Sequence, residues 1–399
     1  MNIKREVYLK RIRPFYNKPL IKVLVGQRRV GKSFILQQIQ QEIKQGNPKA
    51  NIIYIDKEQF KFNFIHDEKT LIEYVNKNLK NSATNYLFID EVQEINSFEK
   101  ALRSLLNEGK VDIYCTGSNA HIFSAELSTL LSGRHLEFKI HPLSFIEFLQ
   151  FHQLGADETS LNYYLKYGGL PFLIHLPKED DIIFEYLKNI ISTIVFKDVV
   201  NRYNLRDSAF LDDLIIFIAD NTGNVFSARK IKDFLKSQFI DKSVNSIINY
   251  IKYLEQANIV CRVNRKDVQG KKIFEVGAKY YFEDVGIRHA LVGFRPQDIQ
   301  KVLENMVYNH LEFCGYSVHI GKIGEKEIDF VAEKEGERLY VQVAYLLADE
   351  QTVQREFGNL DAIRDHYPKL VVSMDTLPVH TSYKGIQHWH LKDFLTRCL

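Results

Sequence analysis

The chain has 399 residues, of which 45% are hydrophobic and 26% are charged, the mixture of an ordinary globular protein. This length exceeds what one hydrophobic core usually organises, so we expect several domains. Lys and Arg number 53 against 50 Asp and Glu. Because these charges nearly balance, the composition gives no global case for a nucleic-acid partner, and any basic surface must be local.

The cysteines and the apolar runs give evidence on the cellular compartment of the protein. The cysteines lie far apart in the sequence, without the short paired spacing of a zinc site or of a small disulfide framework; they are Cys115, Cys261, Cys314 and Cys398. We interpret them as reduced thiols of a cytoplasmic protein. The apolar runs are well below the roughly 20 residues that cross a bilayer, and no signal-peptide pattern follows the basic N-terminus. The sequence therefore predicts no membrane association.

A glycine-bounded loop follows the apolar run at residues 21–25 and leads into a helical pattern. It has the spacing G-x-x-x-x-G-K-S, and its residues are Gly26, Gln27, Arg28, Arg29, Val30, Gly31, Lys32 and Ser33, with Phe34 opening the helix. Such a loop curls its backbone N–H groups around a phosphate at the positive end of the helix. Lys32 then neutralises charge on the β- and γ-phosphates, and Ser33 ligates Mg²⁺. The competing interpretation is a chance match in a turn, but the flanking strand and helix favour binding of ATP and Mg²⁺.

Further β-rich runs alternate with helical segments along the first part of the chain, at residues 51–56, 86–90, 112–118 and 136–140. This alternation predicts a parallel sheet with helices on both faces, an αβα sandwich.

The run at 86–90 ends in two acids, at the edge of a parallel sheet where ligands collect. Asp90 is predicted to hold Mg²⁺ through water, and Glu91 to polarise the attacking water. The competing interpretation is a core strand that ends in a solvated acidic turn. After the next run, Ser118 and Asn119 are candidates to sense the γ-phosphate, and their alternative role is that of a helix N-cap.

Together these segments resemble the archaeal-type AAA+ ATPases, a family allied to the STAND NTPases; the matching residues are 26–33, 87–91, 116–119, 132–134 and 142–145. The resemblance covers almost the whole chain. It implies a helical lid whose Gly168-Gly169-Leu170-Pro171 turn places Pro171 near the adenine, whereas without the family this is a helix terminator and a turn. It also implies that Arg134 stabilises transition-state charge, which makes the active form a homo-oligomer if the arginine acts in trans. A surface salt bridge is the alternative role of Arg134.

Three helical segments and two β-rich runs follow, in the order of a winged helix-turn-helix, at residues 210–219, 228–236, 242–256, 259–265 and 272–282. In DNA-binding versions the third helix enters the major groove and the wing touches phosphates. The basic residues of the predicted wing are Arg262, Arg265, Lys266, Lys271 and Lys272. Because winged helices also serve only to pack between domains, contact with duplex DNA and simple packing both stay open.

The last part of the chain resembles the restriction-endonuclease-like domain that ends the same family. An active nuclease needs acids and a lysine in a D…(E/Q)-x-K arrangement, so that Mg²⁺ and the lysine can activate water. The residues that fit the acidic and amide positions are Glu304, Asp329 and Gln342. The lysine position holds Ala344, and Lys322 or Lys326 is the alternative source of the missing charge. We therefore predict a degenerate site without nuclease activity.

The sequence thus predicts an α/β protein of four modules: an AAA+ P-loop core at 1–150, a helical lid at 151–205, a winged helix at 206–293 and a restriction-endonuclease-like domain at 294–399. Its predicted function is that of an ATP-hydrolysing switch or motor that moves the later modules. The residues predicted to act in catalysis are Lys32, Glu91, Asn119 and Arg134. Two other functions stay open, an ATP-regulated DNA-binding or DNA-processing protein and a protein-interaction scaffold.

Overall fold

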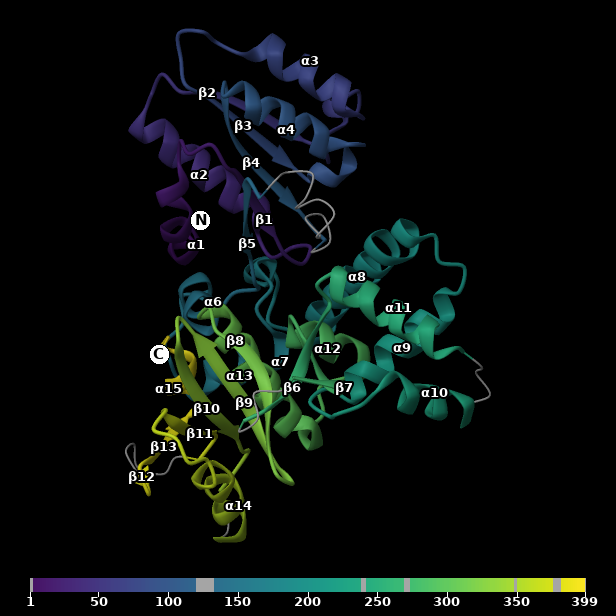
Figure 1. Cartoon of the computed structure of the whole chain (residues 1–399), viewed down its shortest axis with the longest axis vertical. Helices are drawn as coiled ribbons and strands as arrows, with labels where there is room; N and C mark the ends of the chain where they lie inside the picture. Colours follow the sequence, from purple (N-terminus) through teal and green to yellow (C-terminus); the bar gives the residue numbers. More distant parts are fainter. Residues whose placement is uncertain are drawn as a thin grey trace. The chain divides into compact units, whose positions relative to one another are not determined.

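The computed structural model describes residues 3–119, 133–237, 242–268, 273–347, 350–375 and 382–398. They form two compact units (Figure 1), the first comprising Met1–His141 with Gln256–Asn258 and the second Pro142–Glu255 with Ile259–Leu399. The four-module division of the sequence stays a prediction.

The first unit is built around a five-stranded sheet with the order β2-β3-β4-β1-β5, in which every pair is parallel. The strands are β1 (Ile21–Val25), β2 (Asn51–Asp56), β3 (Asn85–Asp90), β4 (Val111–Gly117) and β5 (His135–Lys139). All five strands expected from the apolar runs are present, within one residue at each end. The predicted parallel-sheet core is confirmed.

Helices cover both faces of this sheet, as Figure 1 shows for α2 and α4. The helical elements are α1 (Glu6–Ile12), η1 (Arg13–Phe15), α2 (Lys32–Gly46), η2 (Phe60–Phe62), α3 (Glu68–Asn78), η3 (Val92–Glu94) and α4 (Phe98–Glu108). Alternate strand residues such as Val23 and Ile89 point into the core that Leu71 of α3 and Leu102 of α4 complete. The result is the expected αβα sandwich.

The second unit contains an eight-stranded mixed sheet with the order β12-β13-β11-β10-β9-β8-β6-β7. The strands are β6 (Val260–Asp267), β7 (Ile273–Phe282), β8 (Ser317–Ile323), β9 (Lys326–Lys334), β10 (Glu337–Val343), β11 (Lys369–Ser373), β12 (Ser382–Tyr383) and β13 (Ile386–His390). The β6–β7 hairpin is the predicted wing. Because β6 pairs in parallel with β8, with Arg265 opposite Ile320, the hairpin continues the sheet of the C-terminal part.

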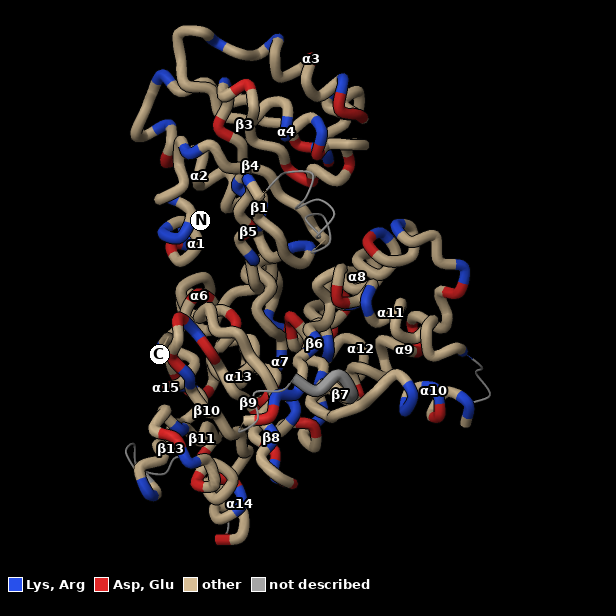
Figure 2. The backbone as a smooth tube through the Cα atoms, in the orientation of Figure 1, with Lys and Arg blue, Asp and Glu red and all other residues tan. Residues whose placement is uncertain are grey.

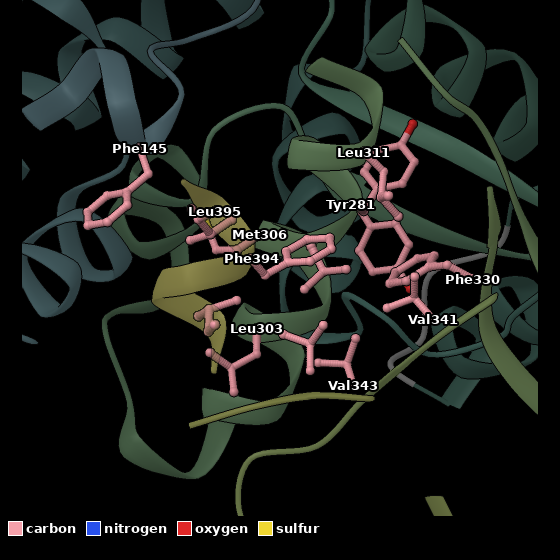
Figure 3. Packing of buried hydrophobic residues seen from close by; sticks show 14 of the residues in the cluster. Phe145, Tyr281, Leu303, Met306, Leu311, Phe330, Val341, Val343, Phe394 and Leu395 are labelled. Atoms are coloured by element: carbon pink, nitrogen blue, oxygen red, sulfur yellow. The ribbon is translucent and has the colours of Figure 1, made fainter. Parts of the chain in front are cut away.

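The helical elements of the second unit are α6 (Phe145–His152), α7 (Glu158–Tyr167), η5 (Pro171–His175), α8 (Asp180–Ile194), the π-helical η6 (Val195–Asn201), α9 (Ser208–Asp220), α10 (Ala228–Ser237), α11 (Val244–Gln256), α12 (Val285–Val292), η7 (Pro296–Asp298), α13 (Ile299–Phe313), α14 (Glu350–Asp361) and α15 (Leu391–Leu395). Side chains from separate elements meet in one core (Figure 3), among them Phe145, Tyr281, Met306, Phe330 and Phe394. The predicted helices before the hairpin correspond to α9, α10 and α11. Whether these elements act as a winged helix stays a prediction.

The prediction of reduced thiols is wrong for two of the cysteines. Cys314, at the end of α13, and Cys398 form a disulfide across a sequence separation of 84 residues, whereas Cys115 and Cys261 are free. Sequence spacing does not show that the chain returns to α13 after α15, and this return brings the two sulfur atoms together. None of the helices in the described ranges is long and apolar enough to cross a membrane.

The predicted Gly-Gly-Leu-Pro turn packs tightly on the start of α12. Gly168 has a φ of +77°, and a Cβ on it would lie 2.2 Å from Oδ1 of Asp284. Asp284 caps α12 by accepting from the Ile287 N–H at 3.1 Å, and it also accepts from the Gly169 N–H at 2.7 Å. Burial raises the pKa of Asp284 to about 6, although these backbone donors oppose the rise. A Cβ on Gly286 would lie 2.0 Å from the carbonyl oxygen of Tyr167.

Replacing Gly286 is expected to make the second unit less stable. In Gly286→Ala the backbone has to shift, which lowers the free energy of unfolding by about 1–3 kcal/mol. The matched control is Gly358→Ala in α14, where an added Cβ meets nothing within 4 Å. The control is expected to be neutral or stabilising, because alanine is the better helix former. Urea denaturation of both variants measures the difference in stability. Equal midpoints would contradict the close packing of Gly286 against the Tyr167 carbonyl group.

Candidate nucleotide-binding site

Two glycines shape the loop between β1 and α2. Gly26 has a φ of +152°, and a Cβ on it would lie 2.2 Å from the carbonyl oxygen of Ile140, so only glycine fits there. Gly31 adopts the left-handed conformation, with a φ of +96°, immediately before α2 begins at Lys32. The loop therefore turns its backbone toward the positive end of a 15-residue helix.

The ammonium group of Lys32 lies inside this loop. Its Nζ donates to the carbonyl oxygens of Gly26 at 2.9 Å and of Gln27 at 3.0 Å, and the side chain is buried. The amide of Gln27 is also buried, and neither its Nε2 nor its Oε1 has a hydrogen-bond partner in the described part of the chain. A buried charge and an unsatisfied buried amide are costly, which is consistent with a loop built to receive a polar ligand.

The other loop residues have different surroundings. Arg28 approaches Glu58 at 3.7 Å, and Arg29 holds a left-handed φ of +68°. Val30 is fully buried, whereas Phe34 is 66% exposed in the first turn of α2.

Arg5 also holds the loop through a hydrogen bond, and the sequence did not indicate this role. Arg5, directly before α1, donates through one guanidinium nitrogen to the carbonyl oxygens of Val30 at 2.9 Å and of His141 at 3.0 Å. The side chain is buried, and its guanidinium lies over the ring of Tyr8. No motif marks this position, because an arginine in a basic N-terminal segment gives no signal of its own.

Strand order places β4 between the loop and the acids. Val25 pairs with Gly117, and Ile89 pairs with Cys115, so the ends of β1, β4 and β3 lie side by side. The loop, Thr116 and Asp90 therefore meet at one edge of the sheet, as the sequence predicts.

Asp90 is held by a hydroxyl group from the neighbouring strand. The Thr116 hydroxyl donates to its Oδ1 at 2.5 Å. Burial raises the pKa of Asp90, while the hydroxyl groups of Thr116 and Ser33 lower it. Ser33 and Asp90 thus lie close enough to offer oxygen ligands to one ion, which fits the preference of Mg²⁺ for hard oxygen donors.

Glu91 occupies a different electrostatic environment one residue later. It adopts a left-handed φ of +56°, and its N–H donates to the Thr116 hydroxyl at 2.9 Å. Burial raises the pKa of Glu91, but the charges of Lys32 and Arg28 outweigh burial, so its pKa is lowered. The carboxylate is therefore ionised, as a general base must be.

One of the sensor candidates, Ser118, lies beside this carboxylate. The Ser118 hydroxyl donates to Glu91 and also accepts from Nε2 of Gln93 at 3.2 Å. Asn119 is buried, and it is the last described residue before the gap at 120–132. Sequence reasoning missed Gln93, although it stands only two residues after Glu91.

One predicted residue of the first unit does not join this cluster. Arg134 precedes β5, which pairs with the start of β1, whereas the loop follows the end of β1. The five residues of β1, at about 3.3 Å each, separate the two ends, so Arg134 does not act on the loop of its own chain. Its guanidinium donates to Asn107 at 2.8 Å. Pro171 begins η5 in the second unit, and its adenine contact stays a prediction.

Comparison with known proteins identifies the domain that carries these residues. A model of an AAA domain matches residues 18–149, and a model of a domain of unknown function matches residues 158–298. An uncharacterized protein of Haemophilus influenzae is 35% identical over 401 residues, covering 98% of each chain. An uncharacterized protein of Methanocaldococcus jannaschii is 31% identical over 362 residues, covering 86% of this chain and 79% of the other. The chain belongs to the family of these two proteins.

The AAA domain of this family member is a P-loop NTPase of the AAA+ type. A solved structure with the same fold is a Walker-type ATPase of Pyrococcus abyssi, with a TM-score of 0.51 at 14% identity. The alignment covers 73% of this chain and 96% of that one, and at this identity it shows the fold alone. The closer assignment to archaeal-type or STAND ATPases stays a prediction.

The basic residues of the β6–β7 hairpin are only partly available to a ligand. Lys266 forms an ion pair with Glu333 of β9 at 2.6 Å, and Arg265 is half-buried, whereas Arg262 is exposed. Lys271 and Lys272 lie outside the described residues. Figure 2 shows Lys and Arg interspersed with Asp and Glu along the described chain. The contact with duplex DNA stays a prediction.

The residues predicted to form a degenerate nuclease site come together around a lysine that the sequence did not indicate. Nζ of Lys279, on β7, lies 3.2 Å from Oε2 of Glu304 on α13 and 3.6 Å from Oδ1 of Asp329 on β9. It also lies 2.9 Å from Oε1 of Glu327. Gln342 accepts from the Asp329 N–H at 3.3 Å. The alternatives considered for the missing charge were Lys322 and Lys326, whereas the lysine that contacts these acids is Lys279, which arrives from a strand outside the motif.

This ammonium group fills the space between the carboxylates. Burial disfavours its charge, but the acids around it outweigh burial and raise the pKa of Lys279. Burial and the charge of Glu304 raise the pKa of Asp329 to about 8, although Lys279 opposes the rise. A lysine held by three acids supplies the positive charge that a metal ion supplies in an active nuclease. The loss of nuclease activity stays a prediction, now with this physical reason.

Removing the lysine charge is expected to destabilise the second unit. Lys279→Met leaves buried acids uncompensated, which lowers the free energy of unfolding by about 3–5 kcal/mol at pH 8. The loss is smaller at pH 5, where the acids take up protons. The control is Lys326→Met, an exposed lysine of neighbouring β9 that is expected to be neutral. Urea denaturation at both pH values checks the difference, and equal stability of the two variants refutes the role of Lys279.

The raised pKa of Asp329 is expected to make the stability of the fold depend on pH. Its pKa in the folded chain lies above its ordinary value of 3.8, so the folded state binds more protons than the unfolded state between about pH 4 and pH 8. The contribution of Asp329 to stability therefore falls as the pH rises through this window. Asp329→Asn is expected to flatten the decline measured by denaturation from pH 5 to pH 8. An unchanged slope shows that Asp329 titrates normally.

Proposed function

We propose that this chain hydrolyses ATP in its first unit and acts as an ATP-dependent switch or motor. The observation that carries the proposal is the strand order, which brings the end of β1, where the phosphate loop begins, to the same sheet edge as the acidic end of β3. Ser33 also lowers the pKa of Asp90, so the two residues expected to ligate Mg²⁺ lie close together. The AAA domain assignment also supports the proposal.

The residues divide the chemistry between them. The loop N–H groups and Lys32 bind the β- and γ-phosphates, and Ser33 and Asp90 hold Mg²⁺, which neutralises charge on the phosphate oxygens when bound. Glu91 orients the attacking water and takes its proton. As the water oxygen bonds to the γ-phosphorus, the bond from that phosphorus to the bridging oxygen breaks, and ADP and phosphate leave.

Two finer parts of the proposal concern partners. Arg134 lies at the sheet edge opposite the loop, so it serves hydrolysis only if it reaches the loop of a neighbouring copy, which makes the active form a homo-oligomer. The second unit, with its lysine-filled acidic cluster, would transmit the nucleotide state to a bound protein or to DNA.

Two substitutions separate binding from hydrolysis. Lys32→Ala removes the phosphate-binding charge and is expected to weaken ATP binding at least tenfold, about 1.4 kcal/mol. Glu91→Gln keeps the shape of the base but not its charge, so kcat is expected to fall by about 10²-fold or more while the Kd for ATP stays nearly unchanged. Calorimetry and phosphate release measure the two effects.

The control for both is Lys49→Ala, an exposed lysine in the same unit. It is expected to bind and hydrolyse ATP like the wild type. The proposal fails if the wild type binds no ATP analogue, or if Lys32→Ala binds it as tightly as the wild type does.

A further inference from the structure

Gln93 links the two groups that have to face the attacking water. It lies in η3, the short 3₁₀ turn of Val92–Glu94 that begins directly after Glu91. The left-handed conformation of Glu91 reverses the chain there, which brings the amide of Gln93 back to the carboxylate. Nε2 of Gln93 donates to Oε2 of Glu91 and, at 3.2 Å, to the Ser118 hydroxyl.

The other end of the same amide has no protein partner. Oε1 of Gln93 is buried and accepts no hydrogen bond from any of the residues that the structure describes. A buried acceptor left unsatisfied costs about 1–3 kcal/mol, so such an atom calls for an explanation. The amide cannot rotate to relieve it, because rotation would set a carbonyl oxygen against the ionised carboxylate of Glu91.

Ser118 is held from its other side as well. Its carbonyl oxygen accepts from Nδ2 of Asn258 at 3.4 Å. Asn258 is buried and adopts a left-handed φ of +53° in the segment that the first unit includes beside its main range. The hydroxyl that Gln93 contacts therefore belongs to a residue whose backbone is fixed, and the amide is held at both of its contacts.

We propose that Gln93 is a positioning residue for ATP hydrolysis. Its Nε2 fixes the Glu91 carboxylate against Ser118, and its Oε1 accepts a hydrogen from the attacking water, whose other hydrogen goes to Glu91. The water then has two acceptors in defined places, which aligns its oxygen with the γ-phosphorus. This inference rests on the proposed ATPase function and adds the residue that orients its base.

The test compares Gln93→Ala with Gln93→Glu in the full chain. Glutamate keeps the size of the side chain but loses the amide donor, so it separates packing from hydrogen bonding. Both variants are expected to lower kcat by about 10- to 100-fold and to leave the KM for ATP nearly unchanged, because the lost contacts act on the base and the water.

The pH profile supplies a readout that a merely structural role does not move. The amide donor helps to hold the pKa of Glu91 low. Without it, the acidic limb of the kcat profile is expected to shift to higher pH in both variants, and further in Gln93→Glu, where a second carboxylate repels the first.

Controls distinguish the ways in which the idea can fail. If the wild type binds ATP but does not turn it over, the proposed function falls, and this inference falls with it. If the wild type is active and Glu91→Gln is inactive, but Gln93→Ala keeps the wild-type kcat and pH profile, only the role of Gln93 is refuted. A fall in kcat with an equal loss of ATP binding and no shift of the profile assigns Gln93 to structural support and overturns the proposal.

Discussion

The insertion of β4 between β1 and β3 is the constraint on which the nucleotide site depends. A parallel sheet aligns the carboxyl ends of neighbouring strands, so the residues that leave β4 stand between the phosphate loop and the two acids. Thr116 contacts both acids from this position, because its hydroxyl donates to Asp90 and accepts from the N–H of Glu91. Two adjacent acids are thereby oriented by a strand to which neither belongs. With a different strand order, the same motifs would be present in the sequence but would not meet.

The two acidic clusters of the chain show opposite ways of compensating buried negative charge. At Glu91 the compensating charges belong to Lys32 and Arg28, which stand on a loop whose glycines leave room for a phosphate. At Asp329 the compensating charge is Lys279, which is more buried than the acids that it contacts. In the first case the cations belong to the loop that is predicted to bind a phosphate. In the second case the ammonium itself occupies the centre, and the cluster acts as an internal ion-pair network.

The sequence was sufficient for those parts of the site that follow from local rules. Strands β1 to β5 could be predicted because apolar runs of their length end in turns, and the glycines of the loop could be predicted because the motif fixes their spacing. Arg5, Gln93 and Lys279 could not be found in this way. Each acts through a contact that depends on how distant segments fold together, and none has a residue type that is unusual for its place in the chain.

Dependence on contacts between distant segments also explains why the sequence did not predict the disulfide or the pairing of the β6–β7 hairpin with β8. The disulfide between Cys314 and Cys398 depends on where α15 ends, which is a property of the tertiary fold. The pairing of β6 with β8 depends on a sheet edge that the hairpin residues do not specify by themselves. Local patterning predicts the elements, while the register between elements needs the whole core.

The segment Gln256–Asn258 ties a distant part of the sequence into the candidate nucleotide site. These residues pack in the first unit, although the rest of α11 before them and β6 after them belong to the second. Within the first unit, Nδ2 of Asn258 donates to the carbonyl oxygen of Ser118 directly after β4, and the Ser118 hydroxyl contacts Glu91. The residue that follows β4 is therefore held by an asparagine 140 positions later in the sequence, a contact that no local pattern could reveal because it exists only once the whole unit has folded.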